Sequence, residues 1–124
     1  CSRGCPYGAY FSSNAATLPA ANATGNLTFR PYSIVQSIMY DEGSGKASGV
    51  RIIDAETNED IEFKAKIIFC NASTLSTTQI LLNSTSNRFP NGMGNDSGEL
   101  GHNLMDHTYR VGALGRVEGY EDNY

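Results

Sequence analysis

Four consecutive apolar residues, Ile67 to Cys70, constrain the fold of this chain more than any other stretch. The run is too short for a core helix, and β-branched and aromatic residues dominate it, so it predicts a short strand buried on both faces. Small polar residues follow at once, and the sequence from Thr74 to Asn83 is typical of a helix. A strand, a small-residue turn and a helix form the corner beside which open α/β sheets bind ligands.

This corner has two interpretations. The free N–H groups at the start of the helix, together with the positive end of the helix dipole, suit a phosphate group. The alternative is a plain strand-to-helix connection without a ligand, because most such corners are only structural. The corner alone therefore does not assign a function.

The chain before this corner predicts a helix followed by an antiparallel β-meander. Ser12 or Ser13 can cap a helix over residues 14–22, which Pro19 bends or interrupts and Gly25 ends. Strands between turn residues are predicted at 27–30, 33–41, 48–55 and 61–66. The last of them alternates between apolar and charged residues, so one face of the meander meets water. The predicted fold class is α/β, with an antiparallel meander that leads into a buried parallel strand, and about two helices.

The 124 residues favour a single domain with four consecutive parts. A loop and helix are predicted for 1–25, strands and meander for 26–66, the buried strand and its helix for 67–84, and a loop-rich segment for 85–124. The chain begins with cysteine instead of methionine and ends on a polar, aromatic segment. We therefore expect a piece of a longer protein.

The charge balance excludes some classes of partner. Nine basic residues against thirteen acidic ones give a net charge of −4 without a basic stripe, so nucleic acid is not an expected partner. Unbroken apolar runs reach only about four residues, so no membrane span is expected. No signal-peptide pattern is visible. We expect a soluble protein and leave open whether it belongs to the cytoplasm or the periplasm.

The three cysteines, Cys1, Cys5 and Cys70, do not define a disulfide framework, because their number is odd. Cys1 and Cys5 could close a small loop or supply half of a metal site, but no second pair of cysteines or histidines has matching spacing. Cys70 lies in the predicted strand, where we expect it to act as a small hydrophobic side chain.

His102, Asp106 and His107 form the other group that could do chemistry, by binding a metal or transferring a proton. Their spacing is poor for one helix face and offers no third metal ligand, so ordinary hydrogen bonds to the backbone are expected and no metal site is predicted. The glycine-rich segment 92–98 looks like a phosphate-binding loop, but its third glycine is displaced and no strand precedes it. We predict a surface loop there.

Several segments taken in order resemble the glucose–methanol–choline (GMC) oxidoreductases, flavoproteins that use FAD to oxidise alcohols and sugars. The similarity extends over most of the chain and is greatest to the branch with bacterial gluconate- and sugar-type dehydrogenases. The similar segments are 8–21, 25–30, 46–50, 72–84 and 100–107. The second family signature differs at Thr78, where proline is usual, and at Thr85, where glycine is usual. These differences leave the substrate class open.

The resemblance implies that the chain is the middle part of an FAD-binding, Rossmann-like domain, whose last segment leads towards a substrate domain. It also implies that the backbone of Val35 meets the adenine of FAD, although an ordinary sheet valine is the alternative. Asn71, Ala72 and Ser73 would lie near the adenosine and the diphosphate. In this family the glycine-rich dinucleotide loop would precede this chain and the catalytic histidine would follow it, so no catalytic residue is assigned.

Two hypotheses from different classes follow. In the first, the chain belongs to a GMC-type, FAD-dependent oxidoreductase that acts on a small alcohol or sugar, and its partner is the rest of the parent chain. Alone it would be inactive and would not retain FAD tightly, because the pyrophosphate loop is absent. In the second, the chain is a self-standing, non-catalytic binding or structural module. A longer reading frame with a glycine loop upstream and a histidine downstream would favour the first.

Overall fold

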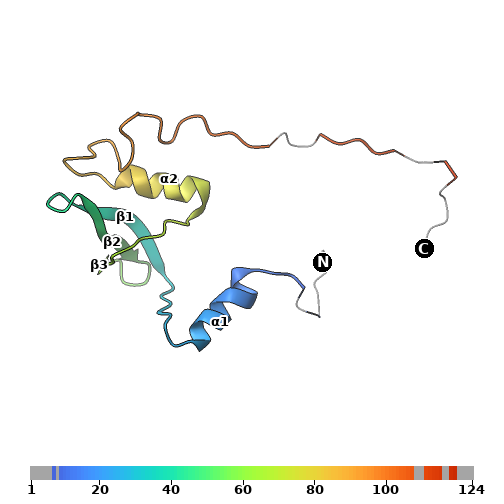
Figure 1. The fold of residues 1–124 in the computed structure, drawn as a ribbon, viewed down its shortest axis with the longest axis horizontal. Coiled ribbons are helices and arrows are strands. Elements are labelled where there is room, and N and C mark those ends of the chain that lie inside the picture. The colour runs from blue at the N-terminus through green and yellow to red at the C-terminus, as the bar shows by residue number, and fades with distance from the viewer. Residues whose placement is uncertain (1–6, 8, 108–110, 116–117, 120–124) are drawn as a thin grey trace. The chain divides into compact units, whose positions relative to one another are not determined.

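The computed structural model describes residues 7, 9–107, 111–115 and 118–119. They belong to two compact units, Cys1–Cys70 and Asn71–Tyr124 (Figure 1). Cys1 and Cys5, considered above as half of a metal site, lie outside the described residues. None of the helices in the described ranges combines the length and the apolar character that a membrane crossing needs.

The first unit begins with a helix whose two parts meet beside a proline. A π-helical turn, η1, spans Ser13–Thr17, and the α-helix α1 spans Leu18–Ala23 (Figure 1). The Ser12 hydroxyl caps the start by accepting a hydrogen bond of 3.2 Å from a backbone N–H of the first turn. Pro19 lies in the first turn of α1, where its missing N–H removes no intrahelical hydrogen bond. The predicted helix over 14–22 and its serine cap are confirmed. The backbone stays helical at Thr17 and Leu18, so Pro19 accompanies a change from π-helix to α-helix and not a break.

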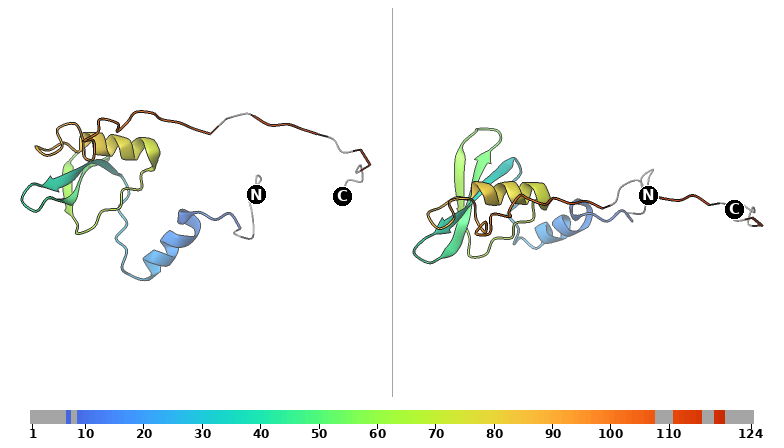
Figure 2. Two further views of the ribbon diagram at one scale, coloured as in Figure 1. Left: turned by 45° about the horizontal axis from the view of Figure 1, so that its top comes forward. Right: turned by 90° about the horizontal axis from the view of Figure 1, so that it is seen from above.

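An antiparallel meander of three strands follows. β1 spans Ser33–Asp41, β2 spans Lys46–Asp54 and β3 spans Asp60–Lys64, in the spatial order β1-β2-β3. Figure 2 shows the three strands twisting relative to one another. The meander confirms three of the predicted strands and the short turns between them. The strand predicted at 27–30 is wrong, because that segment forms none.

The apolar centre of the meander consists of isoleucines on one face. Ile38 of β1 and Ile52 of β2 are buried. They share a face, because Ile38 pairs with Val50, which is two residues from Ile52 on the same strand. Phe63 of β3 stays exposed. The sheet therefore has a small core, and much of its apolar surface is uncovered within the described residues.

The carboxylate of Asp54 connects the segment before β1 to the turn between β2 and β3. The buried Asp54 accepts a hydrogen bond of 2.6 Å from the Arg30 guanidinium through Oδ2. Its Oδ1 accepts from the backbone N–H groups of Glu56 at 2.8 Å and Thr57 at 3.0 Å. The Arg30 hydrogen bond, followed by those two N–H groups, lowers the pKa of Asp54 from 3.8 to about 2.

The segment Ile67 to Cys70 differs from its prediction, which was a short strand buried on both faces. No strand forms there, and the side chains of Ile67 and Phe69 are 72% and 81% exposed. A strand buried on both faces needs hydrogen-bonded neighbours and covering layers. The sheet of the described residues contains only β1, β2 and β3, so it supplies neither. The buried parallel strand is therefore not confirmed.

In the second unit, a long loop folds back along the helix α2, Ser73–Asn83 (Figure 1). The buried Ser84 hydroxyl donates to the carbonyl oxygen of Ile80 at 2.6 Å. The N–H of Met93 donates to the carbonyl oxygen of Leu81 at 2.9 Å. These bonds satisfy carbonyl groups at the end of the helix, where intrahelical partners run out. The predicted helix is confirmed, and the loop is fastened to its last turn.

Two further contacts fix the course of this loop. Gly92 has a φ of 104°, and a Cβ atom there would lie 2.8 Å from Cα of Leu82 and 2.9 Å from the carbonyl oxygen of Leu81. Arg88 and Asp96 form a two-point ion pair with N–O distances of 2.6 and 3.0 Å. The glycine-rich segment is therefore a loop, as predicted. The missing side chain of Gly92 lets this loop pack closely against α2.

We predict that acid destabilises the meander through Asp54. Its pKa is about 2 in the folded protein and 3.8 as the ordinary value, so the unfolded chain binds this proton more readily. The contribution to stability is complete above about pH 4 and is lost as the pH falls towards about 2. Denaturant unfolding followed by circular dichroism should show this loss, and Asp54→Ala should show a smaller one. An unchanged pH dependence in Asp54→Ala would contradict the assignment.

We predict that Gly92→Ala destabilises the second unit by about 2–4 kcal/mol, because a left-handed backbone and a steric clash add together. Gly94→Ala is the matched control. Gly94 also has a positive φ, 76°, but nothing lies within 4 Å of a Cβ atom there, so only about 1–2 kcal/mol of backbone strain is expected. Thermal unfolding measures both. Equal losses in the two variants would show that the contact with α2 contributes nothing.

Candidate functional site

The corner predicted to bind a cofactor lies at the start of α2. Asn71 and Ser73 are exposed, and Ala72 is half-buried. Ala72 is the N-cap residue, and its methyl side chain cannot accept hydrogen bonds from the first turn. Its own N–H donates to the Thr77 hydroxyl at 3.2 Å, which closes the corner. Ser73 has a φ of 68°, so the chain turns sharply into the helix. The uncapped helix start leaves N–H donors and a positive partial charge for an acceptor.

Val35, the other predicted cofactor residue, lies at an irregular point of an edge strand. β1 is at one end of the strand order, so one side of its backbone has no neighbouring strand among the described residues. Val35 pairs with Ile52, and the register shifts between Val35 and Ser37. A bulge of this kind redirects backbone groups out of the regular ladder. The main chain at Val35 can therefore offer hydrogen bonds that a central strand could not.

These candidates belong to different parts of the chain. Val35 is in the first unit, whereas Asn71, Ala72 and Ser73 are in the second. Val35 is 37% exposed, and Asn71 and Ser73 are exposed.

A groove along α2 is the feature of the second unit that sequence reasoning missed. It has a volume of about 400 Å³. It is lined by Thr74, Leu75 and Thr78 of the helix and by the returning segment from Gly101 to Met105. The groove depends on the loop that folds back from the end of α2 to its beginning, a non-local arrangement with no local sequence signal. The resemblance over residues 100–107 marked this segment without predicting its contact with the helix.

The histidines do not gather into a metal site in the described residues. His102 lines the groove, while His107 lies further along an exposed, extended segment. The backbone N–H of His107 donates to a carboxylate oxygen of the adjacent Asp106 at 2.7 Å. Within the described ranges, no group of three or more histidine, cysteine, aspartate or glutamate side chains could hold a metal ion. The expected hydrogen bonds of the imidazole rings to the backbone stay a prediction.

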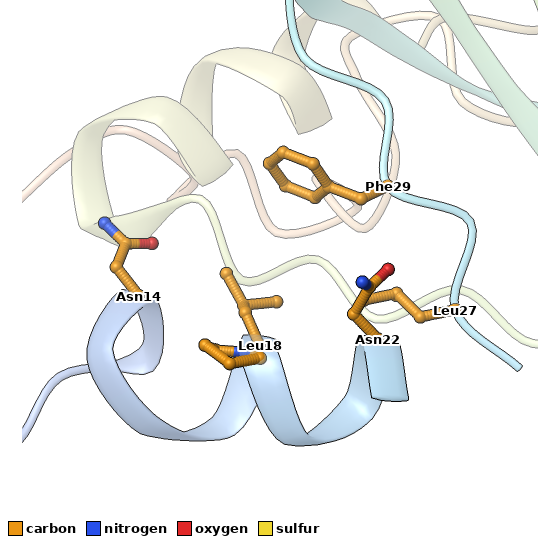
Figure 3. A pocket seen from close by; sticks show the side chains of 6 residues that line it. Asn14, Leu18, Asn22, Leu27 and Phe29 are labelled. Carbon is orange, nitrogen blue, oxygen red and sulfur yellow. The ribbon is translucent and has the colours of Figure 1, made fainter. Parts of the chain in front are cut away.

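A second hollow occurs in the first unit, between the helical segment and the extended chain that follows it (Figure 3). Its volume is about 300 Å³. Leu18 and Phe29 point into it from opposite sides. It is lined by Asn14, Leu18, Pro19, Asn22, Leu27 and Phe29. None of the predicted cofactor residues lines this hollow, and its side chains offer little besides apolar surface and two amides.

Comparison with known proteins decides the family. A family model described as GMC oxidoreductase matches residues 1–109. The chain belongs to the GMC oxidoreductase family. It is also 34% identical over 122 residues to the 2-methyl-1,2-propanediol dehydrogenase of Mycolicibacterium austroafricanum. That alignment covers 95% of this chain and 22% of the relative, so the chain spans about a fifth of the length of this relative. No solved structure matches the chain.

This GMC membership confirms the resemblance found in the sequence and supports an oxidoreductase. The structure agrees with an α/β fold through its three-stranded sheet and its helices. The roles of Val35, Asn71, Ala72 and Ser73 as cofactor residues stay predictions.

Proposed function

We propose that the chain is part of an FAD-dependent oxidoreductase that acts on the CH–OH group of a small alcohol or sugar. The observation that carries this proposal is the GMC oxidoreductase match over residues 1–109. The relative named as a 2-methyl-1,2-propanediol dehydrogenase supports an alcohol as the class of substrate. The rest of a longer parent chain is the partner that would complete the enzyme.

The donors at the start of α2 suit the diphosphate and adenosine side of FAD. Phosphate oxygens only accept hydrogen bonds, and an uncapped helix start offers N–H donors with a positive partial charge. Asn71 and Ser73 add exposed polar side chains, and the small side chain of Ala72 lets a ligand approach the backbone closely. The residues present therefore fit this part of the cofactor.

Val35 would contribute through its main chain. An adenine edge carries an amino donor beside ring nitrogen acceptors, and a backbone residue has one donor and one acceptor. The edge position of β1 and the register shift after Val35 support such pairing. The side chain of Val35 is 37% exposed, so it offers apolar surface for one face of the ring.

When bound, FAD supplies the acceptor for the hydride that leaves the alcohol carbon. The role proposed for this chain is to bind and orient the adenosine end of the cofactor. No residue of the chain is assigned to proton transfer. We infer that the 124 residues alone neither retain FAD tightly nor turn over substrate.

The proposal is tested on the protein produced from its complete native reading frame. We expect it to be purified with flavin absorbance and to reduce the flavin when a small alcohol or sugar is added without oxygen. Protein that lacks flavin absorbance, and that stays free of flavin after incubation with FAD and gel filtration, would refute the proposal.

A charge substitution at the start of α2 tests the diphosphate assignment. Thr74→Asp places a carboxylate at the positive end of the helix, so it should stabilise the fold by about 0.3–1 kcal/mol. The same charge should repel a diphosphate and weaken FAD binding by about tenfold or more. Thermal unfolding of the apoprotein and FAD titration measure the two opposite effects.

Gln79→Glu is the matched control, because it adds the same charge to an exposed position of α2 away from the first turn. It should leave FAD affinity close to that of the wild type. Unchanged FAD affinity in Thr74→Asp would exclude the helix start as the diphosphate site.

A further inference from the structure

One peptide bond in the loop after α2 combines a chemically labile pair of residues with a protected structure. Asn91 is the only asparagine of the chain that is followed by glycine. This pair favours deamidation, because glycine has no side chain to shield its nitrogen from the amide carbon of the preceding asparagine. Asn91 is exposed, so water and hydroxide reach its amide.

The backbone around this pair forms a closed turn. The N–H of Gly92 donates to the carbonyl oxygen of Phe89 at 3.2 Å. Pro90 occupies the second position of this turn, where its fixed φ favours the geometry. The carbonyl oxygen of Asn91 accepts a hydrogen bond of 2.9 Å from Nδ2 of Asn95. The two polar groups of the peptide between Asn91 and Gly92 are therefore both held.

The turn is also fastened to α2 and closed on its outer side. Gly92 is buried, and the N–H of Met93 donates to the carbonyl oxygen of Leu81 at 2.9 Å. The ion pair of Arg88 and Asp96, with N–O distances of 2.6 and 3.0 Å, joins the two ends of the loop around the labile pair. The peptide can therefore reorient only if the loop opens.

Deamidation requires a backbone geometry that the closed turn does not provide. The nitrogen of Gly92 must bond to Cγ of Asn91 in a five-membered ring, which needs this nitrogen turned towards Cβ of Asn91. At the third position of such a turn ψ is about 0°, which turns the nitrogen towards the backbone N of Asn91 instead. Rotation to the reactive geometry would break the hydrogen bonds with Phe89 and Asn95.

We propose that Asn91 is a deamidation site that the packed loop keeps unreactive, and that it reacts in molecules whose loop has come away from α2. In the open loop, hydroxide takes the proton of the Gly92 nitrogen, which then attacks Cγ of Asn91. The bond from Cγ to Nδ2 breaks, and ammonia leaves with a proton from water. Water then opens the ring at either carbonyl and yields aspartate or isoaspartate.

Isoaspartate at this position prevents the loop from closing again. It passes the main chain through the former side chain, which lengthens the backbone by one carbon just before Gly92. The contact with α2 has no room for a further carbon, since even a Cβ atom at Gly92 would lie 2.8 Å from Cα of Leu82. Met93 would also lose its register with the carbonyl of Leu81. Deamidation therefore makes a transient opening permanent.

Folded and unfolded protein should differ in the rate of this reaction. Protein from the complete reading frame is incubated at mildly alkaline pH with and without guanidinium chloride, and peptide mapping by mass spectrometry follows aspartate and isoaspartate at position 91. We expect the folded protein to react about tenfold or more slowly, because modification of an opened segment follows the population of the open state. Equal rates would overturn the proposal, and so would an unreactive Asn91 in the unfolded chain.

Two substitutions loosen the loop without changing the reactive pair. Asn95→Asp removes the donor to Asn91 and keeps the oxygen that accepts from the N–H of Leu100 at 3.1 Å. Asp96→Ala removes the ion pair with Arg88. Each should speed deamidation of the folded protein by about two- to fivefold, the factor that the loss of one exposed interaction gives. Each should leave the rate in denaturant unchanged.

Glu62→Ala is the matched control, because it breaks a comparable exposed ion pair, with Arg51 at 2.8 Å, in the other unit. It should deaminate Asn91 at the wild-type rate. Wild-type rates in both loop variants would overturn the proposal, and so would an acceleration in Glu62→Ala as large as in Asp96→Ala. A variant that does not fold reacts like the unfolded chain, and the other loop variant then decides.

The isoaspartate form tests the consequence for the loop. Separated from unmodified protein by its additional negative charge, it should unfold at a lower temperature. An equal unfolding temperature would show that the loop closes in spite of the longer backbone and would overturn the permanent opening.

Discussion

The carbonyl groups at the end of α2 determine the arrangement of the second unit. A helix end leaves such groups without intrahelical partners, and burial makes that costly. Here the Ser84 hydroxyl and the N–H of Met93 satisfy the carbonyls of Ile80 and Leu81. Because Met93 comes from the loop, this bond also turns the chain back along the helix. The groove at the start of α2 is a consequence of how the end of α2 is capped.

Sequence reasoning succeeded where structure is decided locally. The strand Ser33–Asp41 has exactly the predicted bounds, since apolar patterning and turn residues on both sides specify it without distant partners. Helix α2 begins one residue before the prediction. The segment 27–30 is apolar enough for a strand, but its last residue, Arg30, forms an ion pair with Asp54 and joins no ladder. A local pattern could not foresee that ion pair.

The candidate site shows the same division. The corner at Asn71 to Ser73 was found because small polar residues before a helix are visible in sequence. The groove was missed because it requires residues near 75 and near 103 to meet. For Asn103, the sequence offered only the resemblance of segment 100–107 to the family. Its amide donates to Glu99, four residues earlier, in a turn whose geometry the amino-acid types alone do not give.

The run from Ile67 to Cys70, in which Ile67 and Phe69 are exposed, links the wrong prediction to the proposed function. Fully burying a side chain such as Ile67 or Phe69 contributes about 1.5–3 kcal/mol, so a protein gains little by leaving both in water. Four consecutive apolar residues suit a strand that has neighbouring strands beside it and covering layers on both faces. The described residues do not provide them. In the proposed function, the rest of a longer parent chain supplies these surroundings.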